Sequence, residues 1–226
     1  MSTTFITASG TEIGKTFVTA ALIYEFKRRG ETVRALKPIV SGFDDNDAQE
    51  SDPGILLTAL GETLSPAAIA RIAPWRFTAP LSPDMAARRE GRAIDFDALV
   101  AFSRTAMKGQ QNRLLIEGVG GVMVPLTTDQ TVLDWIAALD DVSAVLVGGS
   151  YLGAISHTLT ALNALNQSGV SVRAIVVNET PGSAVDLDET TATIARFAPG
   201  TTVIAWPRLA GPNIAHPALQ RLADLL

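Results

Sequence analysis

Short runs of apolar and β-branched residues alternate with longer amphipathic stretches along the chain. Several of the short runs show no alternation between apolar and polar positions, which is typical of strands buried on both faces of a parallel sheet. The runs that predict strands are residues 5–8, 32–36, 114–116, 143–147, 172–177 and 202–205.

The stretches between these runs have the spacing of amphipathic helices. Residues 15–29 place Val18, Leu22 and Phe26 on one stripe, and the pattern stops at Gly30. The last turn of this helix is basic, which suits the negative end of a helix dipole. Further helices are predicted at residues 54–60, 95–107 with Asp95 as N-cap, and 154–167.

Strands and helices therefore alternate along most of the chain. This order predicts an α/β fold with a doubly wound, mostly parallel sheet, helices on both faces and right-handed crossovers. The chain has no visible linker, low-complexity tract or internal repeat, so residues 1–226 are expected to form a single domain. Ligands of such sheets bind beyond the carboxyl ends of the strands, and the residues after each strand are the candidates for chemistry.

The first predicted strand runs into residues 8–16, which read ASGTEIGKT, and a helix follows at once. Gly14, Lys15 and Thr16 at the start of a helix form the core of a phosphate-binding loop, where backbone N–H groups surround phosphate oxygens. Lys15 would reach the β- and γ-phosphates of ATP, and the Thr16 hydroxyl would bind Mg²⁺. Ser9 stands where the strict motif has a glycine, so the alternative is an ordinary helix start. The context favours a P-loop NTPase-like domain.

Two charged residues end predicted strands, and a third precedes a short helix. Lys37 could stabilise the negative charge that spreads over phosphoryl oxygens during transfer, or it could be a surface lysine. Glu117 precedes the glycine-rich stretch 118–121 and would bind Mg²⁺ or its water, the alternative being a cap. The spacing of Asp52 favours an N-cap of the helix at 54–60, and a Mg²⁺ ligand is the alternative.

Composition narrows the function classes. The 226 residues include no cysteine, which excludes disulfides, cysteine-ligated metal and a thiol nucleophile. A formal charge of -5 argues against a nucleic-acid partner. No apolar run is long enough for a membrane span, and the first residues lack the pattern of a secretory signal, so we expect a cytoplasmic protein.

These segments together resemble the dethiobiotin synthetase family over nearly the whole chain. The resemblance rests on the loop at 11–16, on KPIVSG at 37–42, on EGVGG at 117–121 and on LGAISH at 152–157. It implies an enzyme that carboxylates 7,8-diaminononanoate with CO₂, phosphorylates the carbamate with ATP, and closes the ureido ring of dethiobiotin. It also implies a homodimer, in which the start of the helix near Gly153 binds the substrate carboxylate across the interface.

The resemblance assigns roles to individual residues. Lys15 and Lys37 would act on the carbamate and phosphoryl oxygens, while Thr11 and Ser41 would contact the carbamate or amine end of the substrate. The residues implied to hold Mg²⁺ are Thr16, Asp52 and Glu117. The residues implied to bind ATP are Glu12, Ile13, Gly14, Lys15, Thr16, Glu117, Gly118, Gly120, Asn178 at the adenine edge and Pro207 beside the base.

The chain departs from the family pattern at four places. Ala8-Ser9-Gly10 replaces Gly-Thr-Asp in the loop, and Pro53 follows Asp52 where alanine is common. Tyr151 stands where a basic residue is frequent, and Asp84 stands where a histidine is frequent. None of these changes removes an expected catalytic group. His157, in the first turns of the helix at 154–167, is expected to serve structure or an interface.

Two alternatives belong to other functional classes. A regulatory ATPase of the Min/Par type would carry a second lysine inside the phosphate loop, and residues 8–13 contain none. A nucleotide-binding module without catalysis would bind ATP and would not consume it in response to a diamine.

Overall fold

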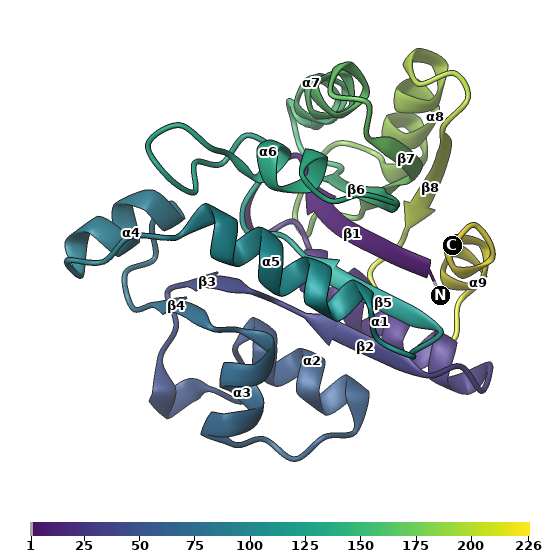
Figure 1. The fold of residues 1–226 in the computed structure, drawn as a ribbon. Helices are drawn as coiled ribbons and strands as arrows, with labels where there is room; N and C mark the ends of the chain where they lie inside the picture. Colours follow the sequence, from purple (N-terminus) through teal and green to yellow (C-terminus); the bar gives the residue numbers. More distant parts are fainter. Residues whose placement is uncertain (1) are drawn as a thin grey trace.

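The computed structural model describes residues 2–226. A six-stranded sheet in the order β2-β5-β1-β6-β7-β8 forms the centre of the molecule, and every neighbouring pair is parallel (Figure 1). Its strands are β1 (Ser2–Ala8), β2 (Val33–Leu36), β5 (Arg113–Glu117), β6 (Val142–Gly149), β7 (Ser171–Asn178) and β8 (Thr202–Trp206). The predicted doubly wound α/β fold is confirmed.

Helices cover both faces of this sheet. They are α1 (Lys15–Arg28), α2 (Asp52–Leu60), α3 (Pro66–Ile72), α4 (Pro83–Arg89), α5 (Phe96–Met107), α6 (Val132–Ala137), α7 (Ala154–Gln167), α8 (Leu187–Phe197) and α9 (Pro217–Asp224). Right-handed crossovers place α1 and α9 on one face and α5 to α8 on the other, and α2 packs beside α1 and β2. Each predicted helix is present, with Asp95 accepting a hydrogen bond from the Ala98 N–H as the N-cap of α5.

A second, two-stranded sheet was not expected from the sequence. Strands β3 (Ile39–Ser41) and β4 (Trp75–Phe77) pair in parallel, and β3 follows the edge strand β2 after only two residues. The chain reaches β3 directly after Lys37-Pro38, so this small sheet carries the segment that follows Lys37. Buried side chains of both sheets belong to the same hydrophobic cluster.

The strand order decides which loops meet. Strand β1 lies between β5 and β6, and Ile6 is level with Glu117 across the β1–β5 pair. Strand β2 is level with β5 up to the pair Leu36 and Ile116. Lys37, Glu117 and the loop after Ala8 therefore leave the sheet at the same edge.

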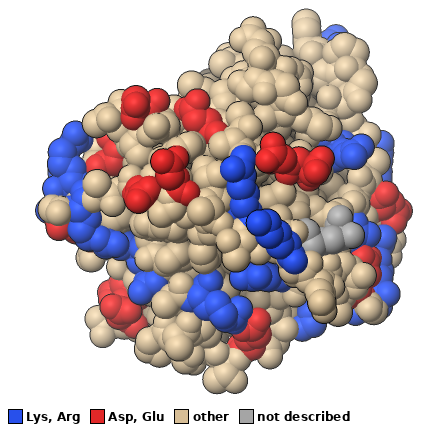
Figure 2. Space-filling model, viewed as in Figure 1, with Lys and Arg blue, Asp and Glu red and all other residues tan. Residues whose placement is uncertain are grey.

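The described surface carries charges of both signs. Figure 2 shows acidic and basic side chains interspersed over the face seen in Figure 1. No helix within residues 2–226 is long and apolar enough to cross a membrane.

Trp135 anchors α6 against the centre of the sheet. Its fully buried indole packs edge-on against Phe5 of β1, with 4.8 Å between the ring centroids. Its Nε1–H donates to the Ser103 hydroxyl of α5 at 3.1 Å. The side chain thus links α6 with β1 and α5.

We expect Trp135→Ala to lower the free energy of unfolding by about 3–5 kcal/mol, because it removes a large buried side chain and leaves a cavity. Urea unfolding followed by far-UV circular dichroism measures this. Trp75→Ala, at a partly exposed position, is the comparison and should cost less. A loss below about 1 kcal/mol for Trp135→Ala would contradict the packing described.

Candidate active site

The loop between β1 and α1 turns sharply at two residues. Glu12 has a φ of 57° and Gly14 a φ of 91°, both in the left-handed region. A side chain at Gly14 would meet the Asn178 amide nitrogen at 2.4 Å, so this position requires glycine. Gly14 is the N-cap of α1, and no side chain in the described chain caps this helix. The first N–H groups of α1 are therefore available to an anion.

A cavity of about 620 Å³ lies beside this loop. Its walls come from the loop itself, from the segment after β2, from the start of α2, from residues before α4 and from the glycine-rich segment after β5. Among the predicted site residues, Thr11, Glu12, Gly14, Lys15, Thr16, Lys37, Ser41, Asp52 and Gly120 line it. This is the phosphate-side cavity.

Lys37 forms the centre of a buried cluster of charges at this cavity. Its ammonium donates to Glu117 Oε1 at 2.7 Å and to the Gly118 carbonyl at 2.8 Å. It also lies 2.9 Å from Asp52 Oδ2. Burial alone would lower the pKa of Lys37, but the Glu117 and Asp52 carboxylates outweigh burial and raise it. Lys37 is therefore a fixed positive charge at neutral pH.

Thr16 joins the same two carboxylates. Its hydroxyl lies 2.7 Å from Asp52 Oδ1 and 2.8 Å from Glu117 Oε1. Glu117 Oε2 is buried and has no hydrogen-bond partner among residues 2–226. Oxygen donors gathered in this way fit Mg²⁺, which prefers hard ligands and usually keeps several waters or phosphate oxygens. The part of the chain that is described contains no group of three or more His, Cys, Asp or Glu that could hold a metal.

Lys15 occupies a different environment. Its ammonium is buried and donates to the Gly10 carbonyl at 3.3 Å. Burial, with a smaller effect from the charge of Lys37, lowers the pKa of Lys15 to about 8. This lysine has weaker compensation than Lys37 and would gain most from an anionic ligand.

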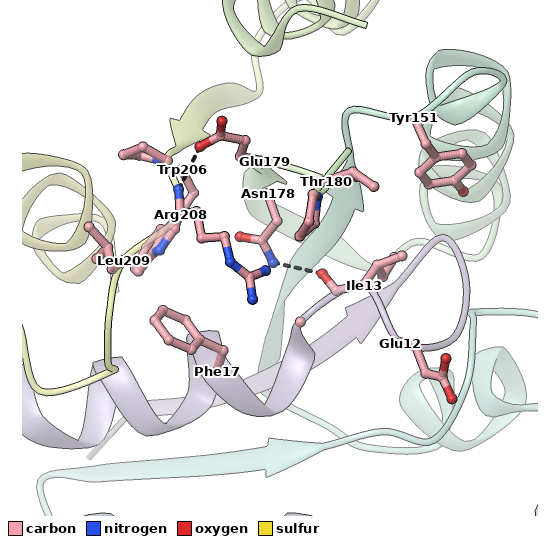
Figure 3. Close-up of a pocket in the computed structure, with 13 residues that line it drawn as sticks. Glu12, Ile13, Phe17, Tyr151, Asn178, Glu179, Thr180, Trp206, Arg208 and Leu209 are labelled. Atoms are coloured by element: carbon pink, nitrogen blue, oxygen red, sulfur yellow. Dashed lines mark hydrogen bonds between the residues drawn. The ribbon is translucent and has the colours of Figure 1, made fainter. Parts of the chain in front are cut away.

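A second cavity, of about 220 Å³, lies on the other side of the loop and shares Glu12 and Gly14 with the first. Figure 3 shows the Asn178 amide pointing toward the loop, where its nitrogen donates to the Ile13 carbonyl at 2.7 Å. The nitrogen is thereby occupied, and the buried Oδ1 of Asn178 has no partner in the described chain. Asn178 therefore presents an acceptor to a ligand.

Mostly apolar side chains complete this second cavity. Phe17, Trp206, Pro207 and Leu209 line it, and the Arg208 guanidinium extends between Phe17 and Asn178 (Figure 3). A flat, mostly apolar slot with one polar end suits a purine base. We call it the base cavity.

The structure brings every predicted site residue to one of these two cavities or to their floor. Ile13, Asn178 and Pro207 line the base cavity, while Glu117 and Gly118 lie beneath the phosphate-side cavity through their contacts with Lys37. The interpretation of Asp52 as a helix cap is wrong. Ser51 caps α2 by accepting from the Gly54 N–H, which leaves the Asp52 carboxylate to face Lys37 and Thr16.

Sequence reasoning missed part of the base cavity. Phe17, Glu179, Trp206 and Arg208 belong to no motif, although their positions early in α1 and after β7 and β8 follow the rule that ligands bind at the carboxyl edge. Tyr151 also lines this cavity, and its hydroxyl lies 2.9 Å from His157 Nδ1.

The fold and the loop after β1 together define the class of protein. A parallel sheet whose first strand leads through a glycine-lysine-threonine loop into a helix is a P-loop NTPase-like domain. The family model described as an AAA domain matches residues 2–210. The chain resembles MinD of Aquifex aeolicus with a TM-score of 0.57, 13% identity and coverage of 100% of this chain and 95% of that one. It resembles chloroplast FtsY of Physcomitrella patens with a TM-score of 0.55 and 15% identity, over 99% of this chain and 64% of that one. Both likenesses show the fold alone.

Curated relatives narrow the class to one family. The ATP-dependent dethiobiotin synthetase BioD of Acidiphilium cryptum is 49% identical over 87% of this chain and 88% of its own length. The protein of the same name from Methylobacterium nodulans is 47% identical over 93% of this chain and 95% of its own length. The chain belongs to the ATP-dependent dethiobiotin synthetase family.

The lowered pKa of Lys15 predicts proton uptake on nucleotide binding. Between its pKa of about 8 and the usual lysine value of 10.5, the folded protein holds this site largely deprotonated. Phosphate oxygens favour the charged form, so binding ADP at about pH 8.5 should take up part of a proton. By the same sign, the unfolded chain binds more protons in this window, so Lys15 makes the nucleotide-free fold more stable as pH rises through it.

Calorimetry of ADP binding in buffers with different ionisation enthalpies measures the proton count. Lys15→Arg is the matched control, because its guanidinium stays charged and should show no uptake. If the binding enthalpy is independent of the buffer for the wild type as well as for Lys15→Arg, the prediction is refuted.

Proposed function

We propose that this chain is an ATP-dependent dethiobiotin synthetase, a cyclo-ligase of biotin biosynthesis. It carboxylates 7,8-diaminononanoate with CO₂ and uses ATP to close the ureido ring. Family membership supports the reaction. One observation supports its location in the structure. Lys15, Lys37, Asp52 and Glu117, from four separate segments, converge on one cavity beside the phosphate-binding loop.

The reaction has three chemical steps. One amine of the diamine attacks CO₂, loses a proton and gives a carbamate. A carbamate oxygen then attacks the γ-phosphorus of ATP, and ADP leaves. The second amine attacks the carbonyl of the resulting mixed anhydride and loses a proton, and phosphate leaves as the ring closes. Each of the last two steps moves negative charge onto phosphoryl oxygens.

The lysines meet this charge. Lys15 lies at the N-terminus of α1, where it reaches the phosphates together with the backbone N–H groups of the loop. Lys37 stands across the cavity and stabilises the carbamate and the transferring phosphoryl oxygens. Fixed donors in a buried site act strongly on developing charge, because they need no reorganisation during the reaction.

Thr11 and Ser41 contact the carbamate or amine end of the diamine. Both line the phosphate-side cavity. In the sequence, Thr11 precedes Lys15 and Ser41 follows Lys37. The Ser41 hydroxyl is buried and, within residues 2–226, has no hydrogen-bond partner, so it is available to a polar substrate group. Lys37-Pro38 and strand β3 hold Ser41 in place.

Thr16, Asp52 and Glu117 hold Mg²⁺. A bound Mg²⁺ would neutralise charge on the β- and γ-phosphates of ATP. Among the chain's own groups, the left-handed turn at Gly14 exposes backbone N–H groups to these phosphates, while Gly118 and Gly120 give the segment after β5 room to pack against Phe5 and Val124.

ATP places its base in the base cavity. Asn178 Oδ1 accepts from the exocyclic amine of adenine, while Pro207 flanks the ring. Glu12 lines both cavities, and the neighbouring Ile13 lines the base cavity, so both would lie along the path from base to phosphates. The tie between Asn178 and the Ile13 carbonyl couples base recognition to the shape of the loop.

The functional enzyme is a homodimer. Leu152 is 91% exposed and Met123 59% exposed, both unusually high for large apolar side chains. Leu152 immediately precedes Gly153, the left-handed N-cap of α7, and Met123 lines a cavity together with His157 of α7. A second copy covering this region would bring the start of α7 to the substrate carboxylate of its partner.

Turnover tests the assignment. Diaminononanoate, bicarbonate, Mg²⁺ and ATP should together yield dethiobiotin, ADP and phosphate, and omission of the diamine should abolish ADP release. Folded protein that forms no dethiobiotin from this mixture would end the assignment.

Lys37→Ala should lower kcat by about 100-fold to 1000-fold, the usual loss when a donor to developing charge is removed. ATP affinity, measured by calorimetry without diamine, should largely survive. Lys27→Ala is the matched control, because Lys27 donates to the Ala59 and Leu60 carbonyls away from the cavities. Near-normal turnover of Lys37→Ala would refute its catalytic role.

Asn178→Asp should weaken ATP binding without changing kcat at saturation. A carboxylate cannot donate to the Ile13 carbonyl, so the loop loses its tie and two acceptors face each other. Asn166→Asp, on the exposed side of α7, controls for the added charge. An unchanged ATP dissociation constant in Asn178→Asp would contradict the proposed base site.

A further inference from the structure

The Lys37 ammonium has all its donors engaged. An ammonium carries three N–H groups, and here the acceptors are Glu117 Oε1, Asp52 Oδ2 and the Gly118 carbonyl, at 2.7, 2.9 and 2.8 Å. The side chain is 3% exposed. In this arrangement Lys37 has no donor left for a phosphoryl or carbamate oxygen.

The carboxylates around Lys37 are short of positive charge and of donors. The single Thr16 hydroxyl lies within hydrogen-bond distance of both Asp52 and Glu117, but one hydrogen can be given to only one of them. Glu117 Oε2 has no partner in residues 2–226, although it is buried. The Lys15 ammonium acts on both carboxylates through its charge, but its hydrogen bond goes to the Gly10 carbonyl and to neither of them. The unpartnered oxygen of Glu117 and the shared Thr16 hydrogen therefore leave room for a further cation at the cluster.

A divalent cation cannot simply be added to this cluster. The oxygens that would bind it are the ones that Lys37 now holds, and the ammonium would lie within a few ångströms of the metal. Repulsion between like charges at that distance is worth several kcal/mol in a buried site. The phosphate-side cavity, which Lys37 lines, offers the ammonium somewhere to go.

We propose that Lys37 serves as the resident cation of the metal site in the nucleotide-free protein and is released toward the substrates when a divalent cation binds with nucleotide. This inference rests on the proposed function for the identity of the metal ligands. Lys37 thus has two positions. In the first it neutralises Asp52 and Glu117, and in the second its donors face the reacting oxygens.

The arrangement has a functional consequence. Before nucleotide and metal bind together, Lys37 makes no contact with the diamine. During that time its positive charge compensates the Asp52 and Glu117 carboxylates. A lysine suits this exchange better than an arginine, because its ammonium is compact and its four-carbon stem is flexible. Among the described residues the Lys15 ammonium donates only to the Gly10 carbonyl, and it needs no such exchange.

The test is a titration of the protein with Mn²⁺ in the absence of nucleotide. The electron paramagnetic resonance signal of free Mn²⁺ measures how much of the metal remains unbound. Wild-type protein should bind Mn²⁺ weakly at this site. Lys37→Met keeps the stem and removes the charge, and it should bind Mn²⁺ about tenfold more tightly or better, because a full positive charge beside the site is gone. Lys27→Met is the matched control and should bind as the wild type does.

A second variant shows where the gained ion binds. Adding Asp52→Asn to Lys37→Met should abolish the gain in Mn²⁺ affinity. Equal Mn²⁺ affinity of wild type and folded Lys37→Met, or a gain that persists with Asp52→Asn, would overturn the proposal.

Nuclear magnetic resonance of the wild type covers the case in which Lys37→Met fails to fold. With ¹⁵N-labelled lysine side chains, the buried Lys37 ammonium should give a slowly exchanging signal in the nucleotide-free protein. Mg²⁺ with ADP should shift it or broaden it, while ADP alone should leave it in place. A Lys37 signal unchanged by Mg²⁺ with ADP would refute the exchange. None of these readouts requires turnover, so they can fail while dethiobiotin synthesis succeeds, and the reverse.

Discussion

A buried ammonium between two carboxylates is the constraint on which the site depends. Removing Lys37 and Glu117 from water, beside the partly exposed Asp52, carries a desolvation cost that their mutual attraction offsets only if the geometry is good. Well-packed apolar residues would stabilise this part of the fold at least as well. Strongly perturbed charges in a cavity are characteristic of functional sites, and here they lie beside the phosphate-binding loop. We therefore interpret the cluster as a source of electrostatic potential for the site, and not as an interaction that stabilises the fold.

The parallel sheet is what makes such a cluster possible. Charged groups from distant segments must be positioned accurately to come within hydrogen-bond distance of one another. The order β2-β5-β1 places the strands that precede them side by side and parallel. Lys37 and Glu117 then leave adjacent strands at the same level, and α1 begins directly above them. Only Asp52 comes from outside the sheet, at the first turn of α2, which packs on α1. Rigid elements thus hold most of the site, and a short helix supplies the last carboxylate.

Periodicity predicted the strands of the central sheet and the principal helices, because buried strands leave a local signature. Motif spacing indicated the phosphate-binding loop with Lys15 and Thr16 and the candidates Lys37 and Glu117. The other site residues were implied by the family resemblance, and the roles of all of them stay predictions. The function of Asp52 could not be read locally, since Ser51 and Asp52 both suit a helix start and only the fold shows which of them faces Lys37. Strands β3 and β4 are too short to leave a period.

The loop and the base cavity show the same limit. A left-handed turn falls at Glu12, which is not a glycine, and the next residue, Ile13, is held by a hydrogen bond from the distant Asn178. Phe17, Trp206 and Arg208 meet only after the chain has crossed the sheet, so no spacing in the sequence announces them. Residues that act through distant neighbours need the tertiary structure.

The two cavities divide affinity from chemistry. The base cavity is mostly apolar, and in the proposed binding mode it would contact a part of ATP that does not react, so its contacts would be equally strong before and during phosphoryl transfer. Such uniform binding raises occupancy and leaves the chemical barrier unchanged. The phosphate-side cavity is lined by Lys15 and Lys37, whose interactions would strengthen in the proposed reaction as negative charge moves onto the transferred oxygens. Since the loop from Glu12 to Gly14 is the wall between them, binding energy from the base can hold that wall in the shape that the phosphates require. An enzyme of this design separates recognition of ATP from its use, and the strained loop is the element that connects the two.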